Sequence, residues 1–373
     1  RYWPGLIGVV TTCSSEIMGD DMVSFLKEAR ARLSREIGRE KTEEIPIVLI
    51  NTPSFAGSHV EGYDRASKAF LESLATTRDV LSERVNIIPG MLYPGDIREI
   101  RHLLEEMNVE GTVLFDISDT LDAPLNPPQE IPYYPPGGTP VSEIRQMANA
   151  RATFALQPHA GGSGARYLER KFGIPAFIGP VPIGVAATDA FLQNLSRITG
   201  REIPASLRDE RGRLVDAMAD TLHHTMMKRV AIFGDPDVVI GMTRFACELG
   251  MTPVAVSSGT PSKTFEGEIE SIFREYRELF LAEPRVFNGG DLFEFEEYLK
   301  TLPQIDLILG HSKGVDISRE LEVPLVRVGF PIYDRFGYQK KPVVGYRGAE
   351  LLLYEIVNEL LDYRYPDDRT QQL

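Results

Sequence analysis

Short, continuously apolar runs alternate with longer amphipathic segments along almost the whole chain. A strand that is apolar on both faces is typical of a parallel sheet covered by helices on both sides. This pattern therefore predicts βαβ units and an α/β protein built from doubly wound, Rossmann-like parallel sheets. The runs that predict strands are 5–11, 45–50, 85–88, 111–115, 152–156, 175–178, 229–233, 252–256, 284–287, 305–309 and 323–328.

The amphipathic segments predict the intervening helices and a division into domains. At about 150 residues per domain, 373 residues predict two or three domains. We expect α/β domains at 1–82, 83–186 and 187–345, followed by a closing helix and a polar tail over 346–373. The predicted helices are 18–33, 61–76, 96–107, 141–149, 164–172, 188–198, 209–227, 237–249, 266–281, 291–300 and 347–362.

Composition excludes several classes of protein. Lys and Arg number 40 against 54 Asp and Glu, a net charge of −14, which disfavours nucleic-acid binding through the phosphate backbone. No apolar run reaches the ~18–20 residues of a membrane span, so we expect no membrane partner. Two cysteines and no secretory signal favour the reducing cytoplasm. No P-loop motif is present, so we expect no ATP binding of that kind.

Ligand-capable side chains follow the first two predicted strands. Cys13 follows the run 5–11, and Ser54 follows the run 45–50. Ligands bind beyond the carboxyl ends of strands in open α/β sheets, and neighbouring parallel strands would bring these two residues close together. A lone cysteine is nevertheless most often a small buried apolar residue, and on composition alone this interpretation of Cys13 is favoured over a ligand role.

Acidic residues occur in two further places. The segment 16–21 begins a predicted helix, where acidic groups favour the helix dipole. Asp216 and Asp220 lie four residues apart on one face of a predicted helix and could share a hard cation such as calcium, although from the residues alone a solvated acidic face is the favoured explanation. The segment 310–314 (GHSKG) ends another predicted strand and could bind a phosphate or line a partner surface.

Several motifs together resemble the beta subunit of nitrogenase component 1. They occur in the family's order over almost the whole chain, which makes the resemblance far more specific than any single glycine motif. They cover 11–21 (TTCSSEIMGDD), 52–64 (TPSFAGSHVEGYD), 85–90, 203–207, 210–216, 234–237 and 328–335.

The resemblance implies roles for particular residues. Cys13 matches a cysteine that ligates the 8Fe-7S P-cluster shared with the alpha subunit, and Ser54 matches a serine that can ligate one iron of the oxidised cluster. Asp216 and Asp220 match an acidic pair that binds a divalent cation at the beta–beta interface. Glu16, Gly19, Asp20 and Asp21 resemble the surface on which the reductase docks.

The family also implies partners. The beta subunit works in an α2β2 heterotetramer, in which it relays electrons from an ATP-dependent iron protein toward the cofactor of the alpha subunit, where N2 is reduced. The remaining cluster cysteines of the family come from an N-terminal segment that this sequence lacks. Because residue 5 already opens a predicted strand, we expect the sequence to begin inside a longer protein. The motifs point to molybdenum, vanadium and iron-only types alike, so the metal of the partner's cofactor stays open.

Three alternatives remain. A cofactor-assembly scaffold of the same fold is disfavoured because we expect scaffolds to lose the pair of Cys13 and Ser54. A nitrogenase-like reductase of another small substrate, such as protochlorophyllide, is disfavoured by the full series of beta-chain motifs. A doubly wound binding protein without a cluster is permitted by fold alone.

Overall fold

The computed structural model describes residues 4–125, 135–279 and 284–364, and these divide into two compact units. The first unit contains residues 4–92 and 109–179, and the second contains 93–108 and the chain from 180 onward. The chain therefore leaves the first unit at residue 93, adds one helix to the second, and returns. The predicted polar tail beyond residue 364 lies outside the described residues.

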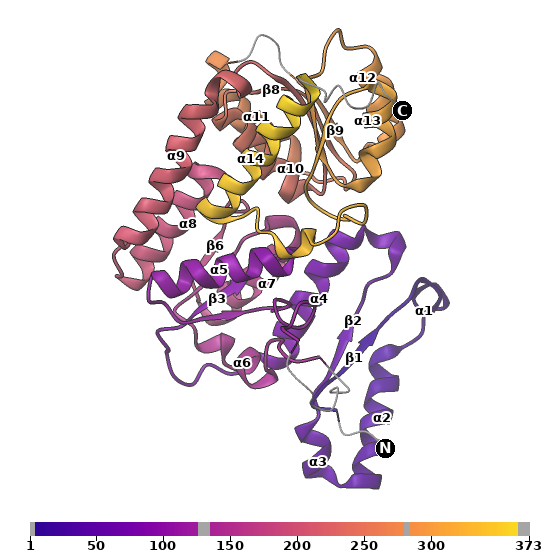
Figure 1. Ribbon diagram of the computed structural model, residues 1–373. Coiled ribbons are helices and arrows are strands. Elements are labelled where there is room, and N and C mark those ends of the chain that lie inside the picture. The colour runs from indigo at the N-terminus through magenta and orange to yellow at the C-terminus, as the bar shows by residue number, and fades with distance from the viewer. Residues whose placement is uncertain (1–3, 126–134, 280–283, 365–373) are drawn as a thin grey trace. The chain divides into compact units, whose positions relative to one another are not determined.

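The first unit holds two parallel sheets (Figure 1). β1 (Ile7–Val10) pairs with β2 (Ile47–Ile50) in a two-stranded sheet. The second sheet has the order β4-β3-β5-β6. Its strands are β3 (Val85–Ile88), β4 (Gly111–Val113), β5 (Ala152–Ala155) and β6 (Ala176–Ile178).

A buried apolar core joins the elements of the first unit. α4 and α7 pack against each other, and the core contains Leu71 of α4, Ile88 of β3 and Leu168 of α7. Val48 and Ile50 of β2 belong to the same core, which anchors β2 beneath α4. The helices are α1 (Cys13–Met18), α2 (Met22–Ile37), α3 (Arg39–Glu44), α4 (His59–Leu74), α6 (Val141–Gln146) and α7 (Pro158–Phe172).

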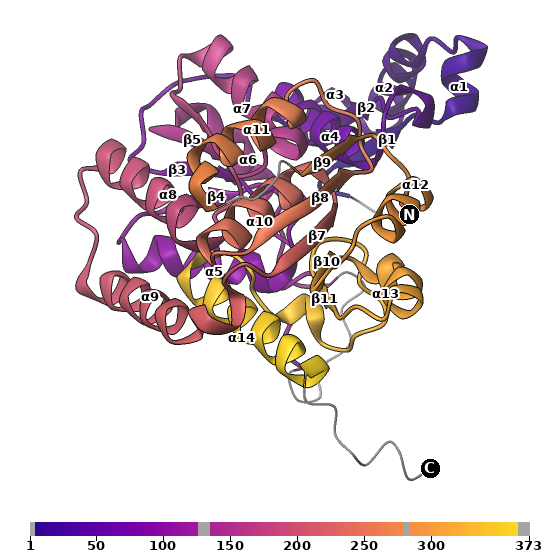
Figure 2. The same cartoon turned by 90° about the horizontal axis from the view of Figure 1, so that it is seen from above.

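The second unit is built on a single parallel sheet (Figure 2). Its order, β11-β10-β7-β8-β9, corresponds when read from β9 to strands 3-2-1-4-5 of the six-stranded Rossmann order, with the first strand in the centre. The strands are β7 (Arg229–Gly234), β8 (Thr252–Ser258), β9 (Arg285–Asn288), β10 (Leu307–Gly310) and β11 (Leu325–Arg327).

The helices of the second unit come from two separate stretches of chain. α5 (Pro94–Glu106) belongs to it and contacts α9 and α14, although its neighbours in sequence belong to the first unit. The others are α8 (Gly184–Thr199), α9 (Ala205–Thr225), α10 (Pro236–Glu248), α11 (Phe265–Glu275), α12 (Leu292–Lys300), α13 (Val315–Leu321) and α14 (Gly345–Arg364).

The α/β fold with parallel sheets is confirmed, and every predicted strand is present to within three residues at either end. Each sheet lies inside one of the predicted ranges 1–82, 83–186 and 187–345, while a division into three domains stays a prediction. The short helices α1, α3 and α13 were not predicted, because each is too short to show an apolar repeat.

The helix predicted over 164–172 begins earlier, at Pro158, and so includes the glycine-rich segment 161–164. This segment lies inside α7, where glycine permits close packing. A Cβ atom at Gly161 would lie 2.8 Å from Cγ2 of Ile88, and one at Gly164 would lie 2.9 Å from Cδ1 of Leu71. The glycines thus let α7 approach β3 and α4 more closely than any residue with a side chain would allow.

Replacing Gly161 should therefore destabilise the first unit. We expect Gly161→Ala to lower the free energy of unfolding by about 1–3 kcal/mol, because Ile88 is buried and stiff and must move. Gly162→Ala is the matched control: its Cβ would meet only the mobile end of Arg166. It should be neutral or stabilising by up to about 1 kcal/mol through helix propensity. Urea unfolding followed by circular dichroism compares the two, and equal stabilities would contradict the packing argument.

Candidate functional site

Because β1 and β2 are parallel, both strands end at the same edge of their sheet. Val10 pairs with Ile50, and the backbone amide of Thr11 donates to the Ile50 carbonyl at 3.0 Å. Just beyond, the amide of Thr52 donates to the hydroxyl of Thr11 at 3.2 Å. The two chains therefore stay in contact past the ends of the strands, which holds the residues that follow in register.

Cys13 and Ser54 meet at this edge, as the strand ends predicted. Cys13 begins α1, and Ser54 begins a 3-10 helix (Ser54–Ala56). The Cys13 sulfur lies 2.7 Å from the Ser54 hydroxyl oxygen, and the Ser54 backbone amide donates to the same sulfur at 3.2 Å. A thiol and a hydroxyl separated by 41 residues are thus adjacent and accessible, with Cys13 half-buried and Ser54 exposed.

The two cysteines of the chain differ in their chemistry. Hydrogen bonds from the Ser54 side chain and from its backbone amide lower the pKa of the Cys13 thiol. Burial instead raises the pKa of Cys247 to about 12, and that side chain is only 1% exposed near the C-terminal end of α10. Since the thiolate is the form that binds metal, Cys13 is suited to be a ligand, whereas Cys247 is a core residue.

The surface around the pair is unusually apolar for one facing water. Val10, Ile17, Met18 and Phe55 are all more than half exposed. An open hollow of about 490 Å³ lies beside Ser54 and is lined by residues between Thr52 and Arg65. Exposed clusters of large apolar residues mark surfaces that contact another protein.

The acidic segment 16–21 forms the turn between α1 and α2. Gly19 ends α1 with φ of 72°, in the left-handed region that favours glycine. Asp21 caps α2 by accepting a hydrogen bond from the Ser24 amide at 3.0 Å and one from its hydroxyl at 2.6 Å, and these bonds lower the pKa of Asp21. Gly19 and Asp21 thus shape the turn, and both are exposed together with Asp20, whereas Glu16 is half-buried.

Asp216 and Asp220 lie on the exposed side of α9. The buried side of this helix carries Leu207 and Leu214. Within the described part of the chain, no third carboxylate, histidine or cysteine groups with the two aspartates. A cation held by Asp216 and Asp220 would therefore need further ligands from elsewhere.

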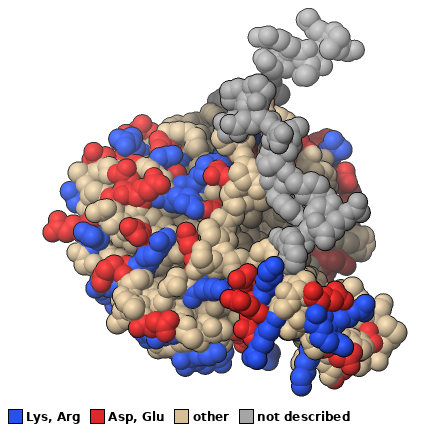
Figure 3. Space-filling view, turned by 90° about the horizontal axis from the view of Figure 1, so that it is seen from below, with Lys and Arg blue, Asp and Glu red and all other residues tan. Residues whose placement is uncertain are grey.

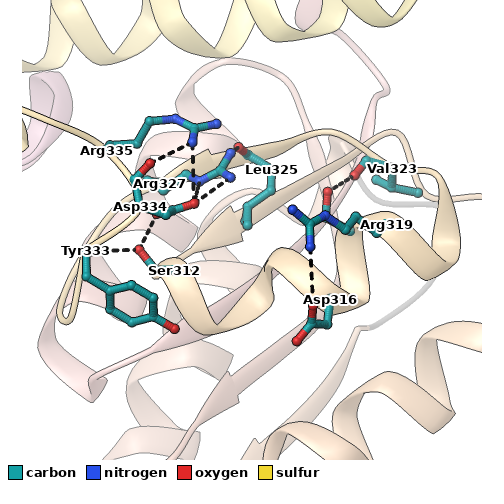
Figure 4. Close-up of polar contacts among 10 residues, drawn as sticks. Ser312, Asp316, Arg319, Val323, Leu325, Arg327, Tyr333, Asp334 and Arg335 are labelled. Atoms are coloured by element: carbon teal, nitrogen blue, oxygen red, sulfur yellow. Dashed lines mark hydrogen bonds and ion pairs between the residues drawn. The ribbon is translucent and has the colours of Figure 1, made fainter.

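Ser312 of the segment 310–314, for which the sequence allows phosphate binding or a partner surface, belongs to a cluster of polar side chains (Figure 4). The Ser312 hydroxyl donates to the Asp334 carboxylate, which also accepts from Arg327 at 2.9 Å and from Arg335 at 3.4 Å. Although partial burial acts to raise it, these bonds hold the pKa of Asp334 below its usual value. Ser312 and Asp334 thus tie the end of β10 to the segment after β11.

Almost the whole chain matches a protein family. Residues 1–361 match the family model described as nitrogenase component 1 type oxidoreductase. The chain belongs to this family. It is 42% identical to the nitrogenase molybdenum-iron protein beta chain of Methanococcus maripaludis, over 100% of this chain and 80% of that one. It is 39% identical to the nitrogenase vanadium-iron protein beta chain of Trichormus variabilis, over 98% of this chain and 78% of that one.

A solved structure agrees with the family assignment. The structure described as "Nitrogenase Cp1 at pH 6.5" superposes with a TM-score of 0.89 at 36% identity, covering 98% of this chain and 78% of that one. This chain is therefore a beta-type chain of a nitrogenase component 1 oxidoreductase, and the assembly-scaffold and cluster-free alternatives are not favoured. The family implies iron-sulfur clusters and an alpha chain as partner.

Two general expectations can be compared with the structure. No helix among the described residues is long and apolar enough to cross a membrane. On the face drawn in Figure 3, acidic and basic side chains of the described residues are intermixed and form no continuous basic surface.

The Asp334 cluster generates a stability prediction. Asp334→Asn should lower the free energy of unfolding at pH 7 by about 1–3 kcal/mol, because it leaves the partly buried Arg327 without its counter-charge. Asp316→Asn is the control, since Asp316 is 94% exposed and lies 3.7 Å from an exposed Arg319 (Figure 4). Its effect should stay within about 0.5 kcal/mol.

The sign of the pH dependence follows from the lowered pKa of Asp334. The stabilisation is complete above the ordinary aspartate pKa of about 3.9 and is lost as the pH falls through the lower folded value. Urea unfolding should show a constant difference between wild type and Asp334→Asn from pH 7 to pH 5, and a smaller one below about pH 4. A difference that grows on acidification would contradict this account.

Proposed function

We propose that this chain relays electrons as the beta subunit of an α2β2 component 1, and that Cys13 and Ser54 ligate the P-cluster shared with the alpha subunit. The observation that carries the proposal is the 2.7 Å contact between the Cys13 sulfur and the Ser54 oxygen at an exposed sheet edge. Membership of the family indicates the reaction, which is nitrogen fixation by an oxidoreductase. The contact between Cys13 and Ser54 indicates which residues of this chain would ligate the cluster.

The donor chemistry of the pair fits an iron-sulfur cluster. When bound, the cluster would accept and pass on electrons. Cys13 would bind iron as a thiolate, the form that its lowered pKa favours. Ser54 has two roles: its amide hydrogen bond to the sulfur orients Cys13, and its deprotonated hydroxyl is a harder ligand that suits more oxidised iron.

The exposed apolar residues beside the pair support an alpha-chain interface at this edge. Ile17, Met18 and Phe55 would be covered there, which removes their apolar surface from water. We place the docking of the iron protein at the turn formed by Glu16, Gly19, Asp20 and Asp21, which projects acidic groups next to Cys13. ATP hydrolysis would belong to that partner, since this chain has no P-loop motif.

A divalent cation between two beta subunits is a further part of the proposal. Asp216 and Asp220 are exposed, lie one helical turn apart, and would supply two oxygen ligands. The remaining ligands would come from the second subunit.

Removing the thiol tests the central assignment. In the full-length protein, isolated without oxygen together with its alpha chain, Cys13→Ala should lower the iron content per αβ pair and abolish the cluster signal that appears in electron paramagnetic resonance on oxidation. The reason is that no other thiol of the described residues lies at this edge.

Cys247→Ala is the matched control. It removes the other cysteine, which is buried in α10, and should leave the iron content and the oxidised signal unchanged. Iron content and signal that remain at wild-type level in Cys13→Ala would refute the ligand assignment.

A further inference from the structure

Three ligand-capable side chains converge in the second unit, on helices that the proposed P-cluster ligands do not touch. Glu99 and His102 lie three residues apart on α5 and so share one face of that helix. Glu210 lies on α9. One donor atom from each of the three residues lies within 4.8 Å of the other two.

The two carboxylates are buried and incompletely paired. Glu99 is 2% exposed and Glu210 is 8% exposed. One oxygen of Glu210 lies 2.8 Å from Nε2 of His102, and one oxygen of Glu99 lies 3.3 Å from the guanidinium of Arg347. The second oxygen of each, Oε1 of Glu99 and Oε2 of Glu210, is buried and has no hydrogen-bond partner. Buried acceptors of this kind are rare, because they lose their hydration without compensation.

The surrounding backbone brings the cluster together. Gly345, at the start of α14, has φ of 72°, and a Cβ there would lie 2.9 Å from Cγ and from Oε1 of Glu99. The Ser206 hydroxyl donates to Glu106, which links the start of α9 to the end of α5. α9 and α14 run side by side and contact each other (Figures 1 and 2). The three helices thus enclose the carboxylates while His102 remains 23% exposed at one side.

The charge balance favours a cation. Two carboxylates face one guanidinium, that of Arg347. One guanidinium cannot neutralise both carboxylates, and their buried oxygens Oε1 of Glu99 and Oε2 of Glu210 have no hydrogen-bond partner, so a further positive charge is favoured there. A bound divalent ion would supply that charge and would occupy the two unpaired oxygens.

We propose that Glu99, His102 and Glu210 bind a single divalent transition-metal ion, zinc or ferrous iron, which joins α5 to α9. An imidazole with two carboxylates suits these ions, whereas calcium and magnesium prefer oxygen ligands alone. Donor atoms at about 2.1 Å from a tetrahedral ion lie roughly 3.4 Å apart, so the side chains need only small movements to close on it. Three protein ligands leave one position for water. The inference is independent of the cluster assignment, because Cys13 and Ser54 belong to the other unit.

Anomalous diffraction tests the site directly. Crystals of the intact protein, prepared without oxygen with the chains it retains, are measured on both sides of the zinc and iron absorption edges, as isolated and after soaking in zinc chloride. We expect a peak between the three side chains, and the edge at which it appears distinguishes zinc from iron. A water molecule at that position, or zinc bound only at the surface histidines, would overturn the proposal.

Conservative variants provide a second readout. Glu99→Gln and Glu210→Gln keep the shape and hydrogen-bonding ability of the side chains, so folding should persist, as circular dichroism can check. Each should weaken zinc binding in equilibrium dialysis with radioactive zinc by about tenfold or more. His223→Gln is the matched control, because His223 is an exposed histidine on the same helix as Glu210. A loss of zinc binding in His223→Gln, with full binding in both glutamine variants, would contradict the proposal.

Discussion

The parallel pairing of β1 with β2 is the constraint on which the proposed electron-transfer site depends. Both strands have only four residues, yet their register places Val10 beside Ile50 and so sets Cys13 against Ser54. Buried Val48 and Ile50 hold β2 against α4, and α4 packs against α7 through glycines that allow close contact. The position of one exposed thiol therefore depends on the apolar core of the whole first unit.

Buried carboxylates have a comparable role in the second unit. Asp96 of α5 accepts a hydrogen bond from the Val343 amide at 2.7 Å, and burial raises the pKa of Asp96 to about 6. Glu248 of α10 accepts from the amides of Val185 and Ala186 at the start of α8, where the helix dipole favours a negative charge. These acids, Asp96 buried and Glu248 half-buried, thus tie helices to segments that are distant in sequence, and the pair of Glu99 and Glu210 differs in having oxygens left unpaired.

The sequence was sufficient for the features that depend on local pattern. Continuous apolar runs located the strands, and parallel strand ends predicted that Cys13 and Ser54 would be adjacent. Features that depend on tertiary contact were missed. Nothing in the sequence indicates that α5 joins the second unit, so the approach of Glu210 to His102 could not be predicted. The spacing of Glu99 and His102 on one helix face was the available signal.

Crystal structures of the intact protein, isolated without oxygen and examined in reduced and oxidised forms, test the central claim most directly. We expect iron bonded to the Cys13 sulfur in both forms and a bond between iron and the Ser54 oxygen that is present only after oxidation. A Cys13 sulfur that bonds no metal in either form, and retains only its contact with Ser54, would contradict the account.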